Sequence, residues 1–221
     1  MVKPRIVETD QGITGEFSTQ MYNIMMRTMR DRGWIETNLI LNEGIITGLA
    51  LEIGPGPGYL GLEWLKRTDG TQLKGLEISS DMIALASKNA TEYHLSHRVT
   101  YYLGDAQQMP FKDGDFDAVF TNGSLHEWAN PVAILNEIDR VVKPGGKYLI
   151  SDLRRDMNPL IKWFLWLTVK PKGMRPGLIT SLNAAYTMAE IREILTNTKL
   201  NGWQVNQNPF GIVISGQKAR D

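Results

Sequence analysis

The sequence predicts an α/β protein, a three-layer sandwich in which helices cover both faces of a mostly parallel β-sheet. Two observations indicate this fold. From Leu49 onward, short apolar runs alternate with longer amphipathic ones, as in repeated βαβ units. A glycine-rich turn directly follows the first of these runs, at the place where open parallel sheets bind ligands.

The expected strands are short apolar or alternating runs, and they cover 49–53, 73–78, 99–103, 116–122 and 147–152. The helices between them cover 59–67, 80–89 and 131 to about 142. Ser79 or Ser80 is the expected N-cap of the second helix, and Asn130 with Pro131 opens the third. The Lys-Pro-Gly-Gly run that follows stops the third helix.

The flanking regions differ from this pattern. Residues 1–45 are rich in methionine and are expected to form a helical cap. Residues 153–180 hold aromatic residues among basic ones and are expected to form a helical insertion after the fifth strand. The chain ends with a capping-box helix and a hairpin whose last strand is antiparallel, at 187–196, 203–207 and 210–215. We expect all 221 residues to form one domain.

Composition limits the classes of protein that fit. The hydrophobic fraction of 42% is enough for a sizeable core. Lys plus Arg and Asp plus Glu number 24 each, and this zero net charge argues against a nucleic-acid binder that neutralises many phosphates. The absence of cysteine excludes disulfides, thiolate metal sites and a cysteine nucleophile. With three histidines, of which His94 and His97 are expected at the surface, we expect no metal site.

We expect no targeting peptide and no transmembrane segment in this sequence. The amino-terminal residues contain no apolar run of signal-peptide length. The longest apolar stretch, residues 160–169, is interrupted by Lys162 and is too short to span a bilayer. We therefore expect a cytoplasmic protein.

The stretch LALEIGPGPGYLGLEWL, residues 49–65, places four glycines between a strand and a helix. The glycines from Gly56 to Gly61 match the G-x-G-x-x-G fingerprint of dinucleotide-binding proteins. The glycines from Gly54 to Gly58, preceded by Glu52, match the nucleoside-binding turn of S-adenosylmethionine (SAM) enzymes. A tight turn without a ligand is the third alternative.

Two carboxylates bear on this choice. Glu77 ends the second strand beside the glycine turn, where a carboxylate accepts hydrogen bonds from both ribose hydroxyls. An exposed glutamate at a strand end is the alternative. Asp105 follows the third strand, where its carboxylate and the N–H of Ala106 are placed to meet an adenine edge. A simple dinucleotide unit does not require this second arrangement.

Several motifs, in order and spacing, resemble those of the Rossmann-like (class I) SAM-dependent methyltransferases, and in particular the ubiquinone/menaquinone C-methyltransferase branch. They are LEIGPGPG, GLEISSDMIALASKNA, GDAQQMPFKDGDFDAVFTNGSLHEW and RVVKPGGKYLISD. The resemblance covers about residues 48–152. It implies a seven-stranded sheet of order 3-2-1-4-5-7-6 with strand 7 antiparallel.

The resemblance also implies a cofactor site. The glycine turn holds the methionine part of SAM, Glu77 holds the ribose, and Ile78 and Met82 flank the adenine unless they are only core residues. Pro55 and Pro57 cannot donate, so the other turn residues supply the N–H groups. The implied cofactor-binding residues are Glu52, Gly54, Pro55, Gly56, Gly58, Glu77, Ile78, Ser79, Met82, Asp105, Ala106, Asn122, Gly123 and Ser124.

His126 is the candidate catalytic base. It follows the fourth strand, at the sheet edge that faces the transferred methyl group, and its ordinary pKa suits proton removal near neutral pH. Positioning of the substrate and a structural hydrogen bond are the alternatives. Glu127 either orients His126 or faces solvent, and Asp152 is a candidate polar contact to the acceptor.

We expect the flanks to recognise the acceptor. Tyr22 or Phe17 either caps the cofactor or packs in the core, and Arg154 and Trp163 belong to a lid over a planar or anionic acceptor. The alternative to a lid is a packed helix with solvated basic residues, which we favour over contact with a membrane. The aromatic helix near residues 160–168 is also a candidate homodimer face.

The sequence therefore predicts a SAM-dependent methyltransferase that acts on a small molecule by in-line displacement and releases S-adenosylhomocysteine. A non-catalytic SAM-binding protein is one alternative. A nicotinamide-dependent oxidoreductase is another, although the GDA motif and the final hairpin argue against it. We expect no nucleic-acid partner.

Overall fold

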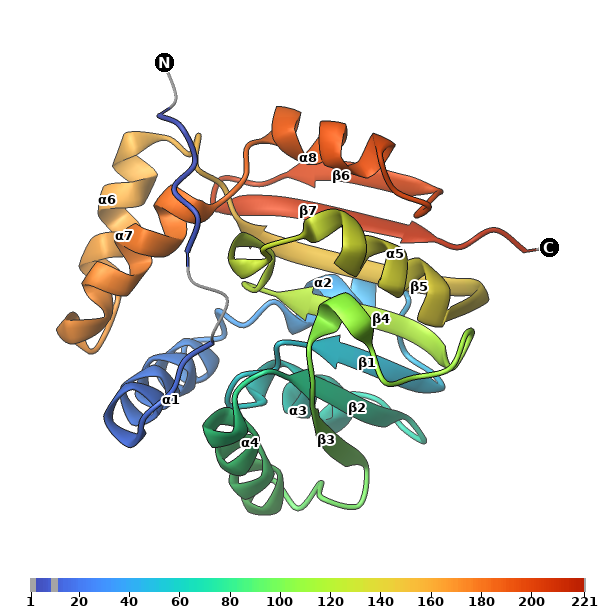
Figure 1. Ribbon diagram of the computed structural model, residues 1–221. Helices are drawn as coiled ribbons and strands as arrows, with labels where there is room; N and C mark the ends of the chain where they lie inside the picture. The colour runs from blue at the N-terminus through green and yellow to red at the C-terminus, as the bar shows by residue number, and fades with distance from the viewer. Residues whose placement is uncertain (1–2, 9–11, 221) are drawn as a thin grey trace.

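The computed structural model describes residues 3–8 and 12–220. Its strands form one sheet in the order β3-β2-β1-β4-β5-β7-β6 (Figure 1). Strand β7 runs in the opposite direction to the other six strands. This order and direction confirm the expected fold. The strands are β1 (Leu49–Ile53), β2 (Gln72–Glu77), β3 (Val99–Leu103), β4 (Phe116–Asn122), β5 (Val142–Leu153), β6 (Trp203–Gln207) and β7 (Gly211–Gln217).

Helices form the outer layers. One face of the sheet packs against α5 and α8, and the other packs against α2, α3 and α4. The remaining helices, α1, α6 and α7, gather near the carboxyl ends of the parallel strands (Figure 1). The helices are α1 (Glu16–Asp31), α2 (Thr37–Asn42), α3 (Tyr59–Lys66), α4 (Ser80–Glu92), α5 (Pro131–Val141), α6 (Pro159–Thr168), α7 (Arg175–Ala184) and α8 (Met188–Thr196).

Local sequence signals account for the helix starts. The Ser79 hydroxyl accepts the Met82 N–H at the start of α4, and the Asn130 side chain accepts the Ala133 N–H at the start of α5. Thr187 and Glu190 form the expected reciprocal capping box. These caps satisfy backbone donors that would otherwise lack a partner at the helix ends.

Two segments differ from the prediction. Strand β5 begins at Val142 rather than 147, because the Lys-Pro-Gly-Gly run continues as extended chain and the β4–β5 register shifts between Phe116 and Ala118. Helix α6 contributes no fully buried side chain, although Ile161, Leu165 and Thr168 are half-buried, so it packs against the protein along one side only.

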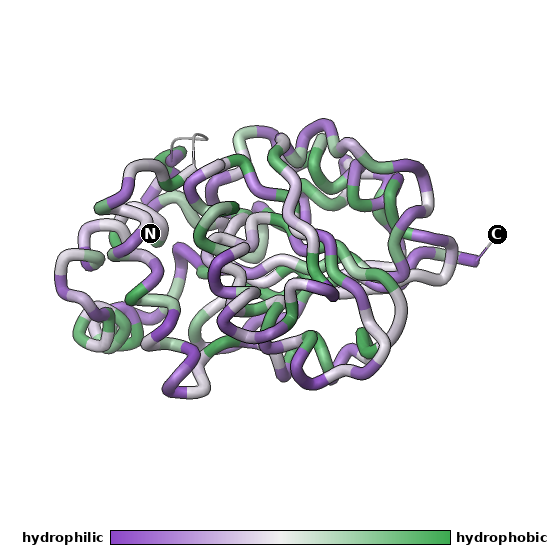
Figure 2. The backbone as a smooth tube through the Cα atoms, turned by 90° about the horizontal axis from the view of Figure 1, so that it is seen from below, coloured by the Kyte–Doolittle hydropathy of each residue, from purple (hydrophilic) through white to green (hydrophobic). Residues whose placement is uncertain are grey.

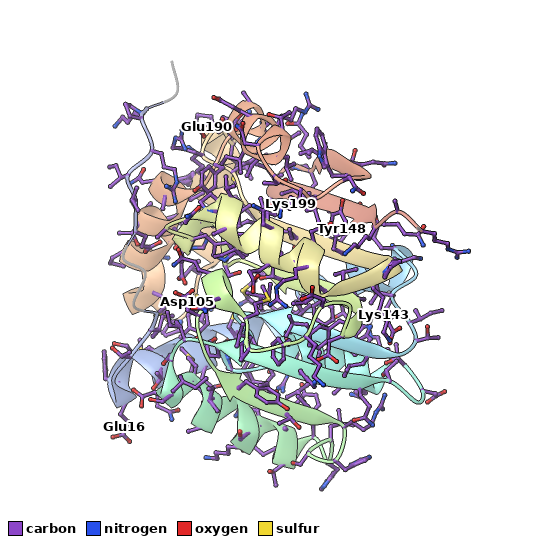
Figure 3. All side chains as sticks on the ribbon, turned by 45° about the vertical axis from the view of Figure 1, so that its right-hand side comes forward. Glu16, Asp105, Lys143, Tyr148, Glu190 and Lys199 are labelled. Carbon is purple, nitrogen blue, oxygen red and sulfur yellow. The ribbon has the colours of Figure 1, made fainter. Side chains whose placement is uncertain are left out.

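The hydrophobic segments concentrate on the strands and on the inner faces of the helices (Figure 2). Within the described residues, no helix has the length and apolar character needed to cross a bilayer. Asp105 lies at the edge of the molecule where α1 is found, whereas Lys143 lies at the opposite end of the sheet (Figure 3). The carboxyl ends of β1, β2 and β4 therefore share one edge with the helical cap.

Glu52 is a carboxyl group inside this core. Its side chain lies on β1 beneath α3 and is only 2% exposed. Gly61 of α3 leaves room for it, because a Cβ at that position would overlap the Glu52 carboxyl group. Burial raises the pKa of Glu52 to about 8. Glu52 is therefore largely protonated at neutral pH.

This burial predicts how stability depends on pH. Protonated Glu52 makes its full contribution to the free energy of unfolding below the ordinary carboxyl pKa of 4.5. This contribution is lost as the pH rises through about 8. Glu52→Gln removes this dependence. In chemical denaturation, the free energy of unfolding of the variant should rise by about 2–4 kcal/mol relative to that of the wild type between about pH 5 and pH 8. Glu43→Gln, at an exposed position, is the control, and parallel stability profiles for wild type and Glu52→Gln would contradict the assignment.

Candidate active site

The turn between β1 and α3 is held by three glycines in the left-handed region. Gly54, Gly56 and Gly58 have φ values of 63°, 52° and 83°. A Cβ on Gly56 would lie 3.3 Å from the Tyr22 ring, and a Cβ on Gly58 would lie 2.6 Å from the Tyr101 hydroxyl oxygen. The lack of side chains therefore lets the turn pack closely against these two tyrosines.

A cavity of about 140 Å³ adjoins this turn. It brings together most of the side chains that the sequence analysis assigned to the cofactor, together with Tyr22 from α1. The predicted residues on its wall are Tyr22, Gly54, Gly56, Glu77, Ile78, Met82, Asp105, Ala106, Asn122, Gly123 and Ser124. Ile78 is 45% exposed and so is not a core residue, whereas Met82 is both buried and part of the wall.

Glu77 is anchored by the backbone around it. One carboxylate oxygen, Oε1, accepts the N–H groups of Ile78 and Ser79 at 2.9 and 3.0 Å, and Oε2 accepts the N–H of Gly56 at 3.0 Å. Burial raises the pKa of Glu77, and these hydrogen bonds oppose the rise. Because a carboxylate oxygen has two lone pairs, Oε2 can accept one further hydrogen bond from a ligand hydroxyl.

Four predicted cofactor residues do not line this cavity. Glu52 is buried beneath α3, as described above. Gly58 caps α3, and Pro55 faces Gly75 of β2. Ser79 caps α4, and its hydroxyl donates to the Ile13 carbonyl at 2.7 Å. The sequence places these residues near the site, but packing and capping direct them away from the cavity.

Asp105 reaches the cavity wall as an exposed side chain. Its carboxylate caps the short 3-10 helix η1 (Ala106–Gln108) by accepting the Gln107 N–H at 2.8 Å. The carboxylate therefore has lone pairs left for an adenine amino group.

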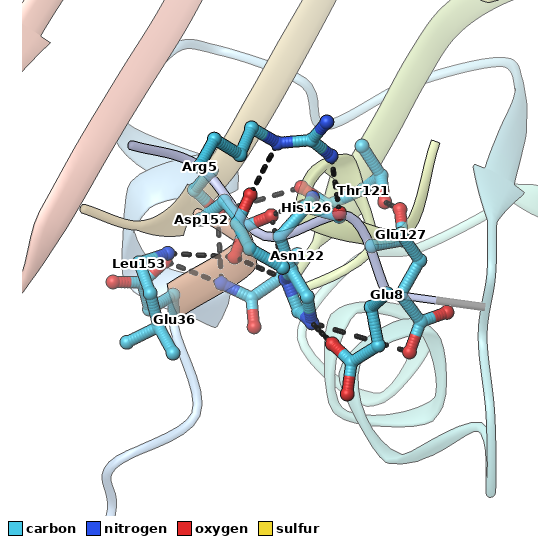
Figure 4. A network of polar contacts seen from close by, with 12 residues as sticks. Arg5, Glu8, Glu36, Thr121, Asn122, His126, Glu127, Asp152 and Leu153 are labelled. Atoms are coloured by element: carbon cyan, nitrogen blue, oxygen red, sulfur yellow. Dashed lines mark hydrogen bonds and ion pairs between the residues drawn. The ribbon is translucent and has the colours of Figure 1, made fainter. Parts of the chain in front are cut away.

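A buried polar network surrounds His126 (Figure 4). Its Nδ1 lies 2.9 Å from both carboxylate oxygens of Asp152, and its backbone N–H donates to Asp152 Oδ2 at 2.6 Å. Its Nε2 lies 3.5 Å from Glu8 Oε2 and 4.0 Å from Glu127 Oε1. Burial by itself disfavours the charged ring, but Asp152 and the two glutamates outweigh it and raise the pKa of His126 to about 9.

His126 is therefore protonated at neutral pH, which does not favour the expected role as a general base. Burial raises the pKa of Glu127 to about 7, against the opposing effect of His126. Glu8, His126 and Glu127 offer ligand atoms within 4.8 Å of one another, a spacing that a metal ion can bridge. The imidazolium lies between Glu8 and Glu127, so ion pairing with it accounts for the cluster.

A second, larger cavity of about 450 Å³ lies on the other side of Asn122 and Gly123, which line both cavities. Asn122 is fixed in place, because its Nδ2 donates to Glu36 Oε2 at 2.6 Å and to Ser151 Oγ at 2.8 Å. Most of the wall is apolar. The residues that line it are Met25, Thr28, Met29, Arg32, Trp34, Glu36, Asn122, Gly123, Asp152, Leu153, Phe164, Leu165, Thr168, Val169, Lys170, Phe210 and Gly211.

The expected acceptor residues have mixed positions. Asp152 lines the second cavity, but its carboxylate is engaged by His126 and by the Leu153 N–H. Arg154 is outside both cavities and pairs with Asp156 at 2.7 Å. Trp163 is also outside them and is 61% exposed. Phe17 is 79% exposed, so it neither packs in the core nor caps the cavity.

Sequence reasoning missed the contribution of the amino-terminal segment. Arg5 donates to the carbonyls of Ala184 and His126, at 2.5 and 2.8 Å, and its guanidinium lies 4.1 Å from the centre of the Tyr186 ring. Farther along, Gly12 and Ile13 line the first cavity. No motif marks these positions, although the resemblance does indicate a cap over the site.

Comparisons with known proteins agree with this geometry. Residues 51–150 match a family model described as a methyltransferase domain. A ubiquinone/menaquinone biosynthesis C-methyltransferase of Cereibacter sphaeroides is 26% identical over 113 residues, covering 51% of this chain and 45% of that protein. A sterol 24-C-methyltransferase of Candida albicans is 34% identical over 124 residues, covering 55% of this chain and 31% of that protein. The chain thus spans half or less of the length of these curated relatives.

Solved structures share the whole fold. A crystal structure from Methanococcus maripaludis, described as a candidate SAM-dependent methyltransferase, has a TM-score of 0.74 at 22% identity and covers 95% of this chain and 99% of that one. A geranyl diphosphate C-methyltransferase of Streptomyces coelicolor, solved with S-adenosylhomocysteine, has a TM-score of 0.64 at 12% identity and covers 83% of this chain and 75% of that one.

The comparisons support neither the non-catalytic nor the nicotinamide-dependent alternative. SAM is the cofactor of the matching family. Residues 51–150 of this chain therefore match a methyltransferase domain, and the chain resembles the class I SAM-dependent methyltransferases, in particular the ubiquinone/menaquinone C-methyltransferase branch.

Proposed function

We propose that this chain transfers a methyl group from SAM to an apolar, planar small molecule bound in the second cavity. The observation that carries the proposal is the meeting of two unlike cavities at Asn122 and Gly123. One cavity has the polar groups that a nucleoside requires, and the other has the apolar wall typical of small-molecule sites. Because the two cavities share these wall residues, a donor in one and an acceptor in the other would lie next to each other at Asn122 and Gly123.

The first cavity fits SAM in its chemistry. Gly54 and Gly56 place backbone on its wall, Glu77 keeps a free lone pair, and Met82 supplies an apolar surface on the same wall as the exposed Asp105. When bound, SAM supplies an electrophilic methyl group on a sulfonium. The work left to this chain is to bind, to align and to manage a proton.

The first cavity must widen to admit a ligand of this size. Sites for drug-sized molecules have volumes of about 300–1,000 Å³, several times its volume. Gly12 and Ile13 form part of its wall, and a hydrogen bond from the Ser79 hydroxyl to the Ile13 carbonyl ties them to α4. We infer that this segment moves outward when the cofactor enters. Residues 1–45 would thus act as a cap and residues 153–180 as the acceptor lid of one methyltransferase domain.

The second cavity suits an apolar acceptor with a flat ring. Trp34, Phe164 and Phe210 supply aromatic faces, and Arg32 and Lys170 supply positive charge at the wall. Two of the similar proteins have names that refer to quinone biosynthesis and to sterol methylation. Quinones and sterols both have apolar ring systems. These descriptions support an apolar acceptor here.

Glu127 is the better candidate for taking a proton from the acceptor. It lines the first cavity a few residues beyond Asn122 and Gly123, where the acceptor would meet the cofactor, and its pKa of about 7 lets it lose its own proton near neutral pH. His126 would instead serve as a fixed cation that keeps Glu127 in place, and Asp152 would be the residue that positions His126. This assignment replaces the general-base role that the sequence suggested for His126.

The direct test of the function is transfer of labelled methyl from SAM to a panel of phenols, quinols and enols. We expect label in the organic extract for at least one apolar ring compound, with no turnover of nicotinamide cofactors. Transfer only to protein or nucleic acid would contradict a small-molecule acceptor.

Glu127→Gln tests the proton acceptor. In the wild type, kcat should rise as the pH increases through about 7, because Glu127 must lose its proton to act. The variant should lose this rise and turn over about 100-fold more slowly. Glu16→Gln, at an exposed position on α1, is the matched control. The same rise with pH in Glu127→Gln would exclude Glu127 from proton transfer.

Leu165→Trp tests the second cavity without a known acceptor. The larger side chain should fill part of the cavity and weaken binding of anilinonaphthalene sulfonate, a flat apolar anion, by about tenfold. Leu167→Trp, two residues along α6 and outside the cavity wall, is the matched control. Fluorescence titration measures the affinity, and equal weakening in both variants would show that the dye binds elsewhere.

A further inference from the structure

We propose that α6 and the turn that follows it dock on the surface of an anionic lipid bilayer, so that the acceptor enters the second cavity from the lipid. The proposal goes beyond the proposed function and rests on it only for the route of the acceptor. It takes up the membrane contact that the sequence analysis ranked below a packed helix, because the structure shows the apolar side chains of α6 exposed.

The first observation is an apolar stripe on α6 that faces solvent. Leu160, Trp163, Phe164 and Leu167 are all exposed and are spaced i, i+3, i+4, i+7, so they share one face of the helix. Leu160 is 75% exposed. An amphipathic helix of a monomeric protein normally turns such a stripe inward, and contiguous exposed apolar patches mark interaction sites.

The second observation is the charge around this stripe. Residues 157–189 contain four lysines and arginines and no aspartate or glutamate. The chain as a whole has zero net charge, so the rest of it carries a net charge of −4. Lys170 and Lys172 are exposed just after α6. An apolar face with cations beside it complements an anionic lipid surface.

The third observation is continuity with the second cavity. Phe164 belongs both to the exposed stripe and to the cavity wall, and Val169 and Lys170 line the cavity where α6 ends. An apolar molecule moving between the lipid and the cavity would therefore pass along α6 without crossing open water. Figure 1 shows α6 on the outside of the molecule, beside α7 and away from the sheet.

The geometry indicates a helix that lies in the interface. Helix α6 has ten residues, about half of the length that spans a bilayer. Its two tryptophans suit the headgroup region, where one side of the ring is apolar and the other is hydrated. Each exposed lysine should strengthen binding to anionic lipid by about fivefold at low salt. A second copy of the chain is a poorer occupant, because a like-charged surface would face itself.

The test is co-sedimentation of the protein alone with vesicles, without SAM or acceptor. Vesicles of phosphatidylcholine are compared with vesicles that also contain about 30% phosphatidylglycerol, at about 50 mM and about 500 mM NaCl. The wild type should bind the anionic vesicles at low salt and lose at least about tenfold in affinity at high salt. Binding to the neutral vesicles should be weaker.

Variants assign the surface. Leu160→Ser with Trp163→Ser should weaken binding at least about tenfold, whereas Ile46→Ser, an apolar-to-serine change at an exposed site outside α6, should not. Lys172→Glu should weaken it at least about fivefold, and Lys88→Glu on α4 should not. Thermal melting checks that each variant is folded. All of the exchanged side chains are outside the two cavities.

Other outcomes overturn the proposal. No binding to anionic vesicles at low salt would do so, as would binding that the paired serine variant leaves unchanged. A wild-type dimer that becomes monomeric in the serine variant, without vesicle binding, would assign the stripe to a second copy. Titration with S-adenosylhomocysteine on the same samples separates the two ideas: cofactor binding without vesicle binding would remove the docking surface and leave the proposed function intact.

Discussion

The parallel pairing of β2, β1, β4 and β5 is the constraint on which the site depends. Parallel strands end at the same edge of a sheet, so this pairing brings Glu77, the glycine turn, Asn122 and Asp152 together from distant parts of the chain. The register places Asn122 opposite Ser151, which fixes the residue that separates the two cavities. Neither cavity would exist if one of these strands paired in another order.

Buried charge gives this edge its chemistry. Three carboxylates surround the His126 ring, and a protonated imidazole is the arrangement that makes their burial tolerable. The amino-terminal segment takes part directly, since Glu8 belongs to the cluster and Arg5 caps the His126 carbonyl. The cap is therefore coupled to the protonation state of the site through His126.

Much of the fold could be predicted because its signals are local. The caps at Ser79 and Asn130 and the capping box at Thr187 each depend on neighbouring residues, and all three were confirmed, as were the predicted strands apart from the start of β5. The position of Glu77 followed from the strand order. The ionisation of His126 could not be predicted in this way, because its pKa is raised by residues from three separate segments. The exposure of α6 was also hidden, since an apolar run looks the same whether it is buried or not.

Calorimetric titration with S-adenosylhomocysteine tests the central claim most directly, with NAD as the competing ligand. The account predicts about micromolar binding of S-adenosylhomocysteine and none of NAD. It also predicts loss of binding in Glu77→Ala and retained binding in Glu92→Ala, an exposed control on α4. Absence of S-adenosylhomocysteine binding to the folded wild type would contradict the assignment of the first cavity and, with it, the proposed methyl transfer.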